Sequence, residues 1–296
     1  MTCLRVNQLL PSDYRLGSIR AINIFTLSPP RWGNRVKMQS IIDVRKNVPS
    51  GTIVINHLQR ANAVPAFGWI QLKQALDDLH QEKQVRAVIV TGAGSVFSAG
   101  TDLHQLQTEL SRDRATASHQ DIEFLNELLM AMLRFPKPII AALNGPAIGS
   151  GAALALACDF IVASESAYIQ LPEIQRGLAP GTAMALLNFR VGAAITTRLG
   201  MTGEKLTSQQ ALVYGLMHDV VAEELVWARA HQLAEDFASD SAQSLQMTKR
   251  ILSETLAESL ETQLQVAGAM TAAARSTSHA RSGIQAFLEG QSPEFD

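Results

Sequence analysis

Two glycine-bearing segments of this chain can present backbone N–H groups to a negatively charged ligand atom. FSAGTDL spans residues 97–103 and NGPAIGSGAALALACD spans residues 144–159, and each follows a predicted strand. In the second segment, Gly149, Ser150 and Gly151 begin an alanine- and leucine-rich helix. The first N–H groups of a helix have no partner within it, and the helix dipole favours negative charge at that end. The two segments therefore predict a site that stabilises an oxyanion.

Glu173 is the one obvious proton carrier that accompanies these turns. It lies in LPEIQRGLAP at 171–180, where it follows a proline and precedes Gly177 and Pro180. Proline restricts φ and glycine is typical of turns, so we expect this loop to be ordered. A glutamate on a loop is usually solvated, but one held beside an oxyanion site can act as a general acid or base.

The segments that must position these residues alternate between strand and helix patterns. Short apolar or β-branched runs predict strands at residues 41–46, 52–55, 85–92, 139–143, 160–163 and 167–171. Apolar periodicity predicts helices near residues 66–81, 124–133 and 151–157. Such alternation is typical of parallel strands joined by crossover helices. From Gly181 onward the pattern is almost all helical, with 216–221 as the one possible extended segment, so we expect an α/β core followed by a helical C-terminal part.

Bulk composition disfavours several classes of protein. With 296 residues, 47% of them hydrophobic, the chain can bury a substantial globular core. A net charge of −2 gives no overall attraction to nucleic acid or to an anionic membrane, so neither is expected as a partner. Cys3 and Cys158 make neither a disulfide framework nor a thiolate zinc site and favour a reducing compartment. Glycine, proline and asparagine interrupt the longest apolar stretch, near residues 139–157, so no membrane span is predicted.

The first 40 residues differ in charge from the rest of the chain. They hold six basic residues and one acid, whereas the remainder holds 19 basic and 26 acidic residues. A basic, acid-poor leader is typical of an organelle transit peptide, but this one lacks a convincing amphipathic helix. The alternative is an unstructured extension, or an upstream start codon in place of Met38. We therefore leave residues 1–40 out of the fold prediction and expect a cytoplasmic protein, with organelle targeting as the alternative.

Taken together and in this order, the two glycine turns and the Glu173 loop resemble the crotonase family, also called the enoyl-CoA hydratase/isomerase family. The resemblance covers roughly residues 41–295. It includes INHLQRANAV at 55–64, which matches a degenerate family segment at Asn62 and Ala63 and departs from it at His57 and Leu58. Further matching segments are KPIIAALNG at 137–145, MTGEKLTSQQALVYGLMHDVV at 201–221 and SGIQAFLEGQSPEF at 282–295.

The resemblance implies an architecture. It predicts a crotonase-like spiral of ββα units over residues 41–205, containing the active site. A helical C-terminal region would follow over residues 206–296 and pack between subunits. The expected assembly is a homotrimer or a dimer of trimers.

The resemblance also implies a substrate and roles. The substrate is an acyl-CoA thioester, whose oxygen binds the backbone N–H groups of Thr101 and Ser150. The family usually has glycine at the second position, and serine is tolerable there if its φ and ψ fit, because the donor is a backbone group. Enolising a thioester places negative charge on this oxygen, which two fixed donors stabilise most in the transition state. Glu173 is then the base, and no metal or redox cofactor is implied.

Contacts with CoA are implied at two further places. The family uses backbone around the N-A segment and the stretch that follows the first oxyanion donor. Here these residues are Ala61, Asn62, Ala63, Asp102, Leu103 and His104. A solvated or CoA-facing role is favoured over a catalytic one for His104.

The reaction within the family depends on how many carboxylates are present. The family's hydratases carry two, and the first of these positions is Ala153 here, whereas the second is Glu173. Addition of water needs one group to activate water and another to handle the α-proton, but moving a proton between C2 and C4 needs only one base. The sequence therefore favours a Δ3,Δ2-enoyl-CoA isomerase, with an enoyl-CoA hydratase as the alternative.

Two other classes remain as alternatives. AIGSGAALAL also resembles the nucleophile segment of Clp peptidases, which would make Ser150 a nucleophile, but no histidine lies between His119 and His218 to serve as its base. A non-catalytic acyl-CoA binder or an RNA-binding relative is the other. The acidic body of the chain argues against RNA.

Overall fold

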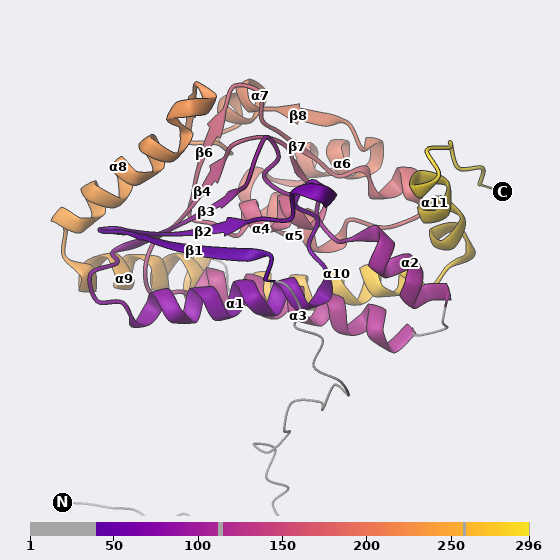
Figure 1. The fold of residues 1–296 in the computed structure, drawn as a ribbon, viewed down its shortest axis with the longest axis horizontal. Coiled ribbons are helices and arrows are strands. Elements are labelled where there is room, and N and C mark those ends of the chain that lie inside the picture. The colour runs from indigo at the N-terminus through magenta and orange to yellow at the C-terminus, as the bar shows by residue number, and fades with distance from the viewer. Residues whose placement is uncertain (1–39, 112–114, 257–258, 296) are drawn as a thin grey trace, which may run out of the picture. The chain divides into compact units, whose positions relative to one another are not determined.

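Six strands form the larger of two sheets in the computed structural model, which describes residues 40–111, 115–256 and 259–295 (Figure 1). The predicted extension at 1–40 falls outside these residues except for Ser40. In sheet order the strands are β1 (Ile42–Asn47), β2 (Ser50–Ile55), β3 (Ala87–Gly92), β4 (Ile139–Leu143), β6 (Phe160–Ser164) and β9 (Asp219–Val221). The first pair is antiparallel and the other neighbours are parallel. The parallel order is the one that the strand-helix alternation predicts.

A second sheet holds three short strands, in the order β5 (Ala147–Ile148), β7 (Tyr168–Gln170) and β8 (Lys205–Thr207). The chain passes from the large sheet to the small one at β4 to β5 and again at β6 to β7. A helix follows each time, first α4 (Ser150–Leu156) and then α5 (Gly181–Val191). This repetition is the predicted spiral of ββα units.

Helices cover both faces of the large sheet because alternate residues of its strands point to opposite sides. Val88 and Ile139 belong to the larger core, which includes side chains of α1 (Ala66–Gln81) and α3 (Ala115–Arg134). Ile89 and Ile140 face the other way and pack with α8 (Val226–Ser239). Figure 1 shows α8 on the opposite side of the sheet from α1 and α3.

The sheets extend beyond the boundary predicted at residue 205. Strand β8 pairs with β7 across residues 205–207, and β9 extends the large sheet beside β6, with α7 (Ser208–Val213) between them. The region from 206 is therefore not wholly helical. The cause is pairing with distant strands, because a segment of three residues carries too little periodicity of its own to reveal a strand.

The C-terminal helices close one side of the molecule around the predicted site. Helix α10 (Leu260–Arg275) packs against α3 and α5, and α11 (Ser278–Leu288) packs against α2 (Leu103–Ser111). The remaining helices are α6 (Ala193–Thr202) and α9 (Ala242–Ile251), followed by a π-helical turn at Leu252–Leu256. None of the helices in the described ranges combines the length and the apolar character needed to cross a membrane.

Candidate active site

The two glycine turns lie against each other. Ser98 and Ala147 form a parallel β-bridge, and the Ile148 N–H donates to the Ser98 carbonyl at 2.9 Å. Gly100 has a positive φ of 85°, and a Cβ at this position would lie 3.0 Å from the nitrogen of Ser150. Glycine is needed at position 100 both for this backbone conformation and for the close approach of the second turn.

The backbone N–H groups of Thr101 and Ser150 have no hydrogen-bond acceptor in the described part of the chain. Val64 bonds to the two neighbours of Thr101: its N–H donates to the Gly100 carbonyl, and its carbonyl accepts from Asp102. Ser150 is the first residue of α4, where no intrahelical acceptor exists. Both residues line a cavity of about 390 Å³. The turns thus leave two backbone donors available beside a cavity, as the sequence predicts.

Glu173 lies directly beside the second turn. It belongs to a 3-10 helix, η2 (Pro172–Arg176), that begins with proline and ends at Gly177, whose φ is 65°. Gly149 has a φ of 56°, and a Cβ there would lie 2.7 Å from Oε1 of Glu173. The positive φ favours glycine at position 149, and a side chain there would also displace the carboxylate from its place beside Ser150.

Burial makes this carboxyl group a weak acid. Glu173 Oε2 is shielded from solvent and has no hydrogen-bond partner among the described residues. Loss of solvation raises the pKa of Glu173 to about 7, against opposing effects of a backbone hydrogen bond and of the Arg176 and Arg275 charges. A group with this pKa can both accept and return a proton near neutral pH.

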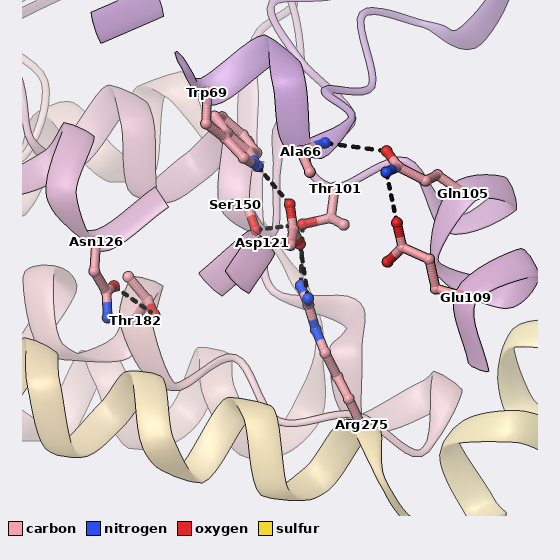
Figure 2. Close-up of polar contacts among 10 residues, drawn as sticks. All are labelled: Ala66, Trp69, Thr101, Gln105, Glu109, Asp121, Asn126, Ser150, Thr182 and Arg275. Atoms are coloured by element: carbon pink, nitrogen blue, oxygen red, sulfur yellow. Dashed lines mark hydrogen bonds and ion pairs between the residues drawn. The ribbon is translucent and has the colours of Figure 1, made fainter. Parts of the chain in front are cut away.

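A buried polar network supports the two oxyanion residues (Figure 2). Trp69 Nε1–H donates to Oδ1 of Asp121 at 2.9 Å, and Arg275 Nη1 donates to Oδ2 at 2.7 Å. Arg275 Nη2 also donates to the Thr101 hydroxyl at 3.3 Å, and that hydroxyl lies 2.9 Å from the Ser150 hydroxyl. Serine is accommodated where the family resemblance leads one to expect glycine, because its hydroxyl has a partner.

Most of the residues predicted to contact CoA line the same cavity. These are Ala61, Ala63, Asp102, Leu103 and His104. The Asp102 carboxylate accepts the His104 N–H at 3.0 Å, which caps the start of α2. The His104 side chain is exposed, in keeping with the CoA-facing or solvated role rather than with catalysis.

Asn62 is not among the lining residues and has a different use. Its side chain is 1% exposed, accepts the His57 N–H and donates to the Ala93 and Val96 carbonyls. These bonds hold a loop in which Ala61 and Asn62 have positive φ values of 49° and 58°. Asn62 therefore shapes the loop that presents Ala61, and its side chain does not reach the cavity.

The cavity wall offers a single available carboxylate within the described ranges. Ala153, where a second one would stand in a hydratase, is fully buried in the core. Asp102 and Glu173 are the only acidic side chains in the lining, and Asp102 is engaged in capping α2. The arrangement can therefore supply two N–H donors and one proton carrier.

A family model for enoyl-CoA hydratase/isomerase matches residues 49–296. The chain belongs to this enoyl-CoA hydratase/isomerase, or crotonase, family. The 1,2-epoxyphenylacetyl-CoA isomerase of Escherichia coli is 31% identical, over 82% of this chain and 94% of its own length. The 2,3-dehydroadipyl-CoA hydratase of the same organism is 32% identical, over 82% of this chain and 93% of its own length.

Solved structures agree with the sequence comparison. An enoyl-CoA hydratase/isomerase from Xanthobacter autotrophicus Py2 superposes with a TM-score of 0.78 at 26% identity, covering 84% of this chain and 93% of that one. The fold is thus the crotonase fold, and the chain is an enzyme of the hydratase/isomerase type.

Sequence patterns did not reveal the charged residues that surround the crotonase-type site. Asp121 and Arg275 are 154 positions apart, and both are almost fully buried. Arg275 is the last residue of the alanine-rich α10. This position is the only local feature of the sequence that distinguishes Arg275 from other arginines. Arg176 likewise lies in the cavity wall, although its place in the PEIQR segment gave no indication of this.

The serine-hydrolase alternative lacks its base. The described neighbour that bonds to the Ser150 hydroxyl is Thr101, and no described histidine does so. A nucleophilic serine needs a histidine within hydrogen-bond reach. The geometry therefore disfavours hydrolysis through Ser150.

Because burial of the ionised Glu173 carboxylate is unfavourable, the difference in stability between wild type and Glu173→Gln should depend on pH. Its pKa is about 7 in the folded protein, against 4.5 for a solvated glutamate. Protonated Glu173 stabilises the folded protein fully at pH values below the pKa of Glu173 in the unfolded chain. This stabilisation is lost as the pH rises through the pKa of Glu173 in the folded protein. Glu173→Gln should therefore increase the free energy of unfolding more at pH 8 than at pH 5, by about 2 kcal/mol.

Urea denaturation at the two pH values measures this difference. Glu224→Gln, at an exposed position, is the matched control and should show no such pH-dependent gain. A Glu173→Gln variant that lost stability relative to wild type on going from the lower to the higher pH would contradict the raised pKa.

Proposed function

We propose that this enzyme is a Δ3,Δ2-enoyl-CoA isomerase in which Glu173 is the single base. The observation that carries the proposal is the cavity wall, where Glu173 is the one available carboxylate in the described lining and two unpaired N–H donors lie beside it. A reaction that needs one proton carrier and stabilisation of an enolate matches this set of groups.

In the proposed reaction the thioester oxygen of a 3-enoyl-CoA accepts hydrogen bonds from the Thr101 and Ser150 N–H groups. The Glu173 carboxylate removes a proton from C2, and the electron pair of that C–H bond forms a dienolate whose charge lies on the bound oxygen. The protonated Glu173 then donates the same proton to C4, while the double bond moves to C2–C3. Substrate and product have equal mass, and the enzyme is regenerated.

The proposed steps use side chains and backbone groups alone, so they require no metal or redox cofactor. CoA would lie along the wall formed by Ala61, Ala63 and the start of α2. The two N–H donors are held before the substrate arrives, because the Ser98–Ala147 bridge joins their turns. Preorganised donors of this kind cost no rearrangement when charge develops, and one donor is typically worth about 3 to 4 kcal/mol.

Hydration is the second candidate, since one of the relatives above is named as a hydratase. It would require water to be activated on one side of the double bond and a proton to be handled at C2. Ala153 supplies no group for the first task, and His104, the one histidine in the described lining, has an exposed side chain. Isomerisation therefore remains the favoured reaction.

We further propose that the enzyme assembles as a homotrimer or a dimer of trimers. Helices α9 and α10 carry apolar side chains that are more than half exposed in the single chain: Met247, Ile251, Val266 and Met270. Packing between subunits would remove such side chains from water, which is favourable. Light scattering should give a mass of three or six chains, and a monomeric mass would contradict the proposal.

Purified enzyme incubated with 3-enoyl-CoA and 2-trans-enoyl-CoA thioesters tests the reaction. The expected result is that 3-enoyl thioesters gain conjugated-thioester absorbance without a change in mass. Glu173→Gln should lower kcat by about a hundredfold or more, the range for loss of a general base, and leave CoA-thioester binding nearly unchanged. Glu224→Gln should turn over at the wild-type rate.

Two outcomes would overturn the proposal. Rapid addition of water to 2-enoyl thioesters without isomerisation would identify a hydratase. Full isomerase activity in Glu173→Gln would show that another group carries the proton.

A further inference from the structure

Arg176 is a cation in the cavity wall with no hydrogen bond or ion pair to any residue of the described ranges. Its Nε is shielded from solvent and has no acceptor. A guanidinium group carries five N–H donors, and buried donors in proteins are nearly always paired. A shielded Nε–H without an acceptor among the described residues, in the wall of a substrate cavity, therefore requires an explanation.

The second arginine of the cavity wall provides a comparison within the same site. Arg275 bonds to the Asp121 carboxylate at 2.7 Å, so its charge is matched by an acid. Arg176 has no such partner, although the Glu173 charge acts on it from a distance. Burial lowers the pKa of Arg176, and the negative charge of Glu173 opposes this effect. Even so, a guanidinium stays protonated at neutral pH.

Phe287 fixes where the Arg176 guanidinium lies. Arg176 Cζ lies 4.1 Å from the centre of the Phe287 ring, which belongs to α11. A guanidinium held over an aromatic ring keeps its planar fork of N–H donors for an acceptor elsewhere. That fork matches the two oxygens of a carboxylate.

The position of Arg176 relative to the base indicates which part of a ligand it meets. Glu173 and Arg176 are three residues apart in the 3-10 helix η2, where side chains at this spacing lie on the same side. Both line the cavity, together with the apolar Leu178 and Leu288. An acyl group whose C2–C4 segment lies at Glu173 would extend along this apolar wall towards Arg176.

We propose that Arg176 is a specificity-determining residue that binds a carboxylate on the far end of the acyl group. The natural substrates are then CoA thioesters of dicarboxylic acids, and the inference rests on the acyl-CoA function proposed above. The ligand carboxylate supplies a hydrogen-bond acceptor, which Arg176 Nε lacks among the described residues. Leu178 and Leu288, which line the same cavity, offer apolar surface to the methylene groups.

Binding of saturated, unreactive thioesters tests this directly. Hexanoyl-CoA and adipoyl-CoA differ only in a terminal carboxylate, and octanoyl-CoA and suberoyl-CoA repeat the comparison for a longer chain. In at least one pair, the wild-type enzyme should bind the carboxylate-bearing ligand about 10 to 100 times more tightly, the range for a charge-assisted hydrogen bond. Arg176→Leu should abolish that preference, and Arg176→Lys, which keeps the charge without the fork, should retain part of it.

Arg281→Leu is the matched control, because Arg281 lies exposed on α11 and outside the cavity lining. It should leave the preference unchanged. Wild-type enzyme that binds both members of each pair equally would overturn the inference. So would an Arg176→Leu variant that keeps the preference.

A comparison of hexanoyl-CoA with its 3′-dephospho form shows whether Arg176 binds the acyl carboxylate or the 3′-phosphate of CoA. If Arg176→Leu weakens hexanoyl-CoA but not its 3′-dephospho form, then Arg176 binds the CoA phosphate and the acyl assignment is wrong. Because these ligands do not react, the test stands whether or not the isomerase activity is found. An enzyme that isomerises neutral 3-enoyl thioesters but shows no carboxylate preference would refute this inference alone.

Discussion

The Glu173 carboxylate rests against the backbone at Gly149, and this contact constrains the rest of the site. A Cβ at position 149 would lie 2.7 Å from Oε1 and displace the carboxylate, and the positive φ would strain any residue other than glycine. The next residue, Ser150, begins α4 and presents one of the two unpaired N–H groups. The base and an oxyanion donor are thus held side by side by one glycine, with no flexible side chain between them.

The cavity brings together several polar groups that have no hydrogen-bond partner among the described residues. The Thr101 and Ser150 N–H groups, Glu173 Oε2 and Arg176 Nε all lack partners in the described chain. An unsatisfied buried polar group typically costs about 1 to 3 kcal/mol. Other buried polar groups near the site are paired within the protein, as in the Asp121–Arg275 ion pair and the Trp69 bond to it. In the proposed function, the acyl-CoA thioester supplies the missing partners, so the cost is recovered on binding.

Local signals in the sequence predicted the parts of the site that local geometry determines. The turns at Gly100, Gly149 and Pro172 have the conformations that these residue types favour. Ala153, an apolar residue, is buried in the core. The strands of five or six residues were predicted to within two residues of their bounds, because their apolar or β-branched runs are a local signal. The short strand β9 was only a possibility in the sequence, because its pairing with β6 arises from the fold.

Arg275, Asp121 and Trp69 come together from α10, α3 and α1, and no sequence spacing connects them. Asn62 was predicted to contact CoA through the backbone of its segment, and the structure adds that its side chain is used inside its own loop. A family motif identifies a position in a pattern, but only packing decides whether the side chain faces the ligand. The charges that distinguish this cavity, Arg176 and Arg275, are therefore the part that required the structure.

The central claim is that one carboxyl group carries the same proton from C2 to C4, and the fate of a label tests it most directly. A 3-enoyl-CoA carrying deuterium at C2 is converted in ordinary water, and the position of deuterium in the product is read by mass spectrometry and NMR. The account predicts product that retains deuterium at C4, because the shielded Glu173 returns what it removed before full exchange with water. Product that carries only solvent hydrogen at C4, even at the earliest times, would contradict a single-base shuttle.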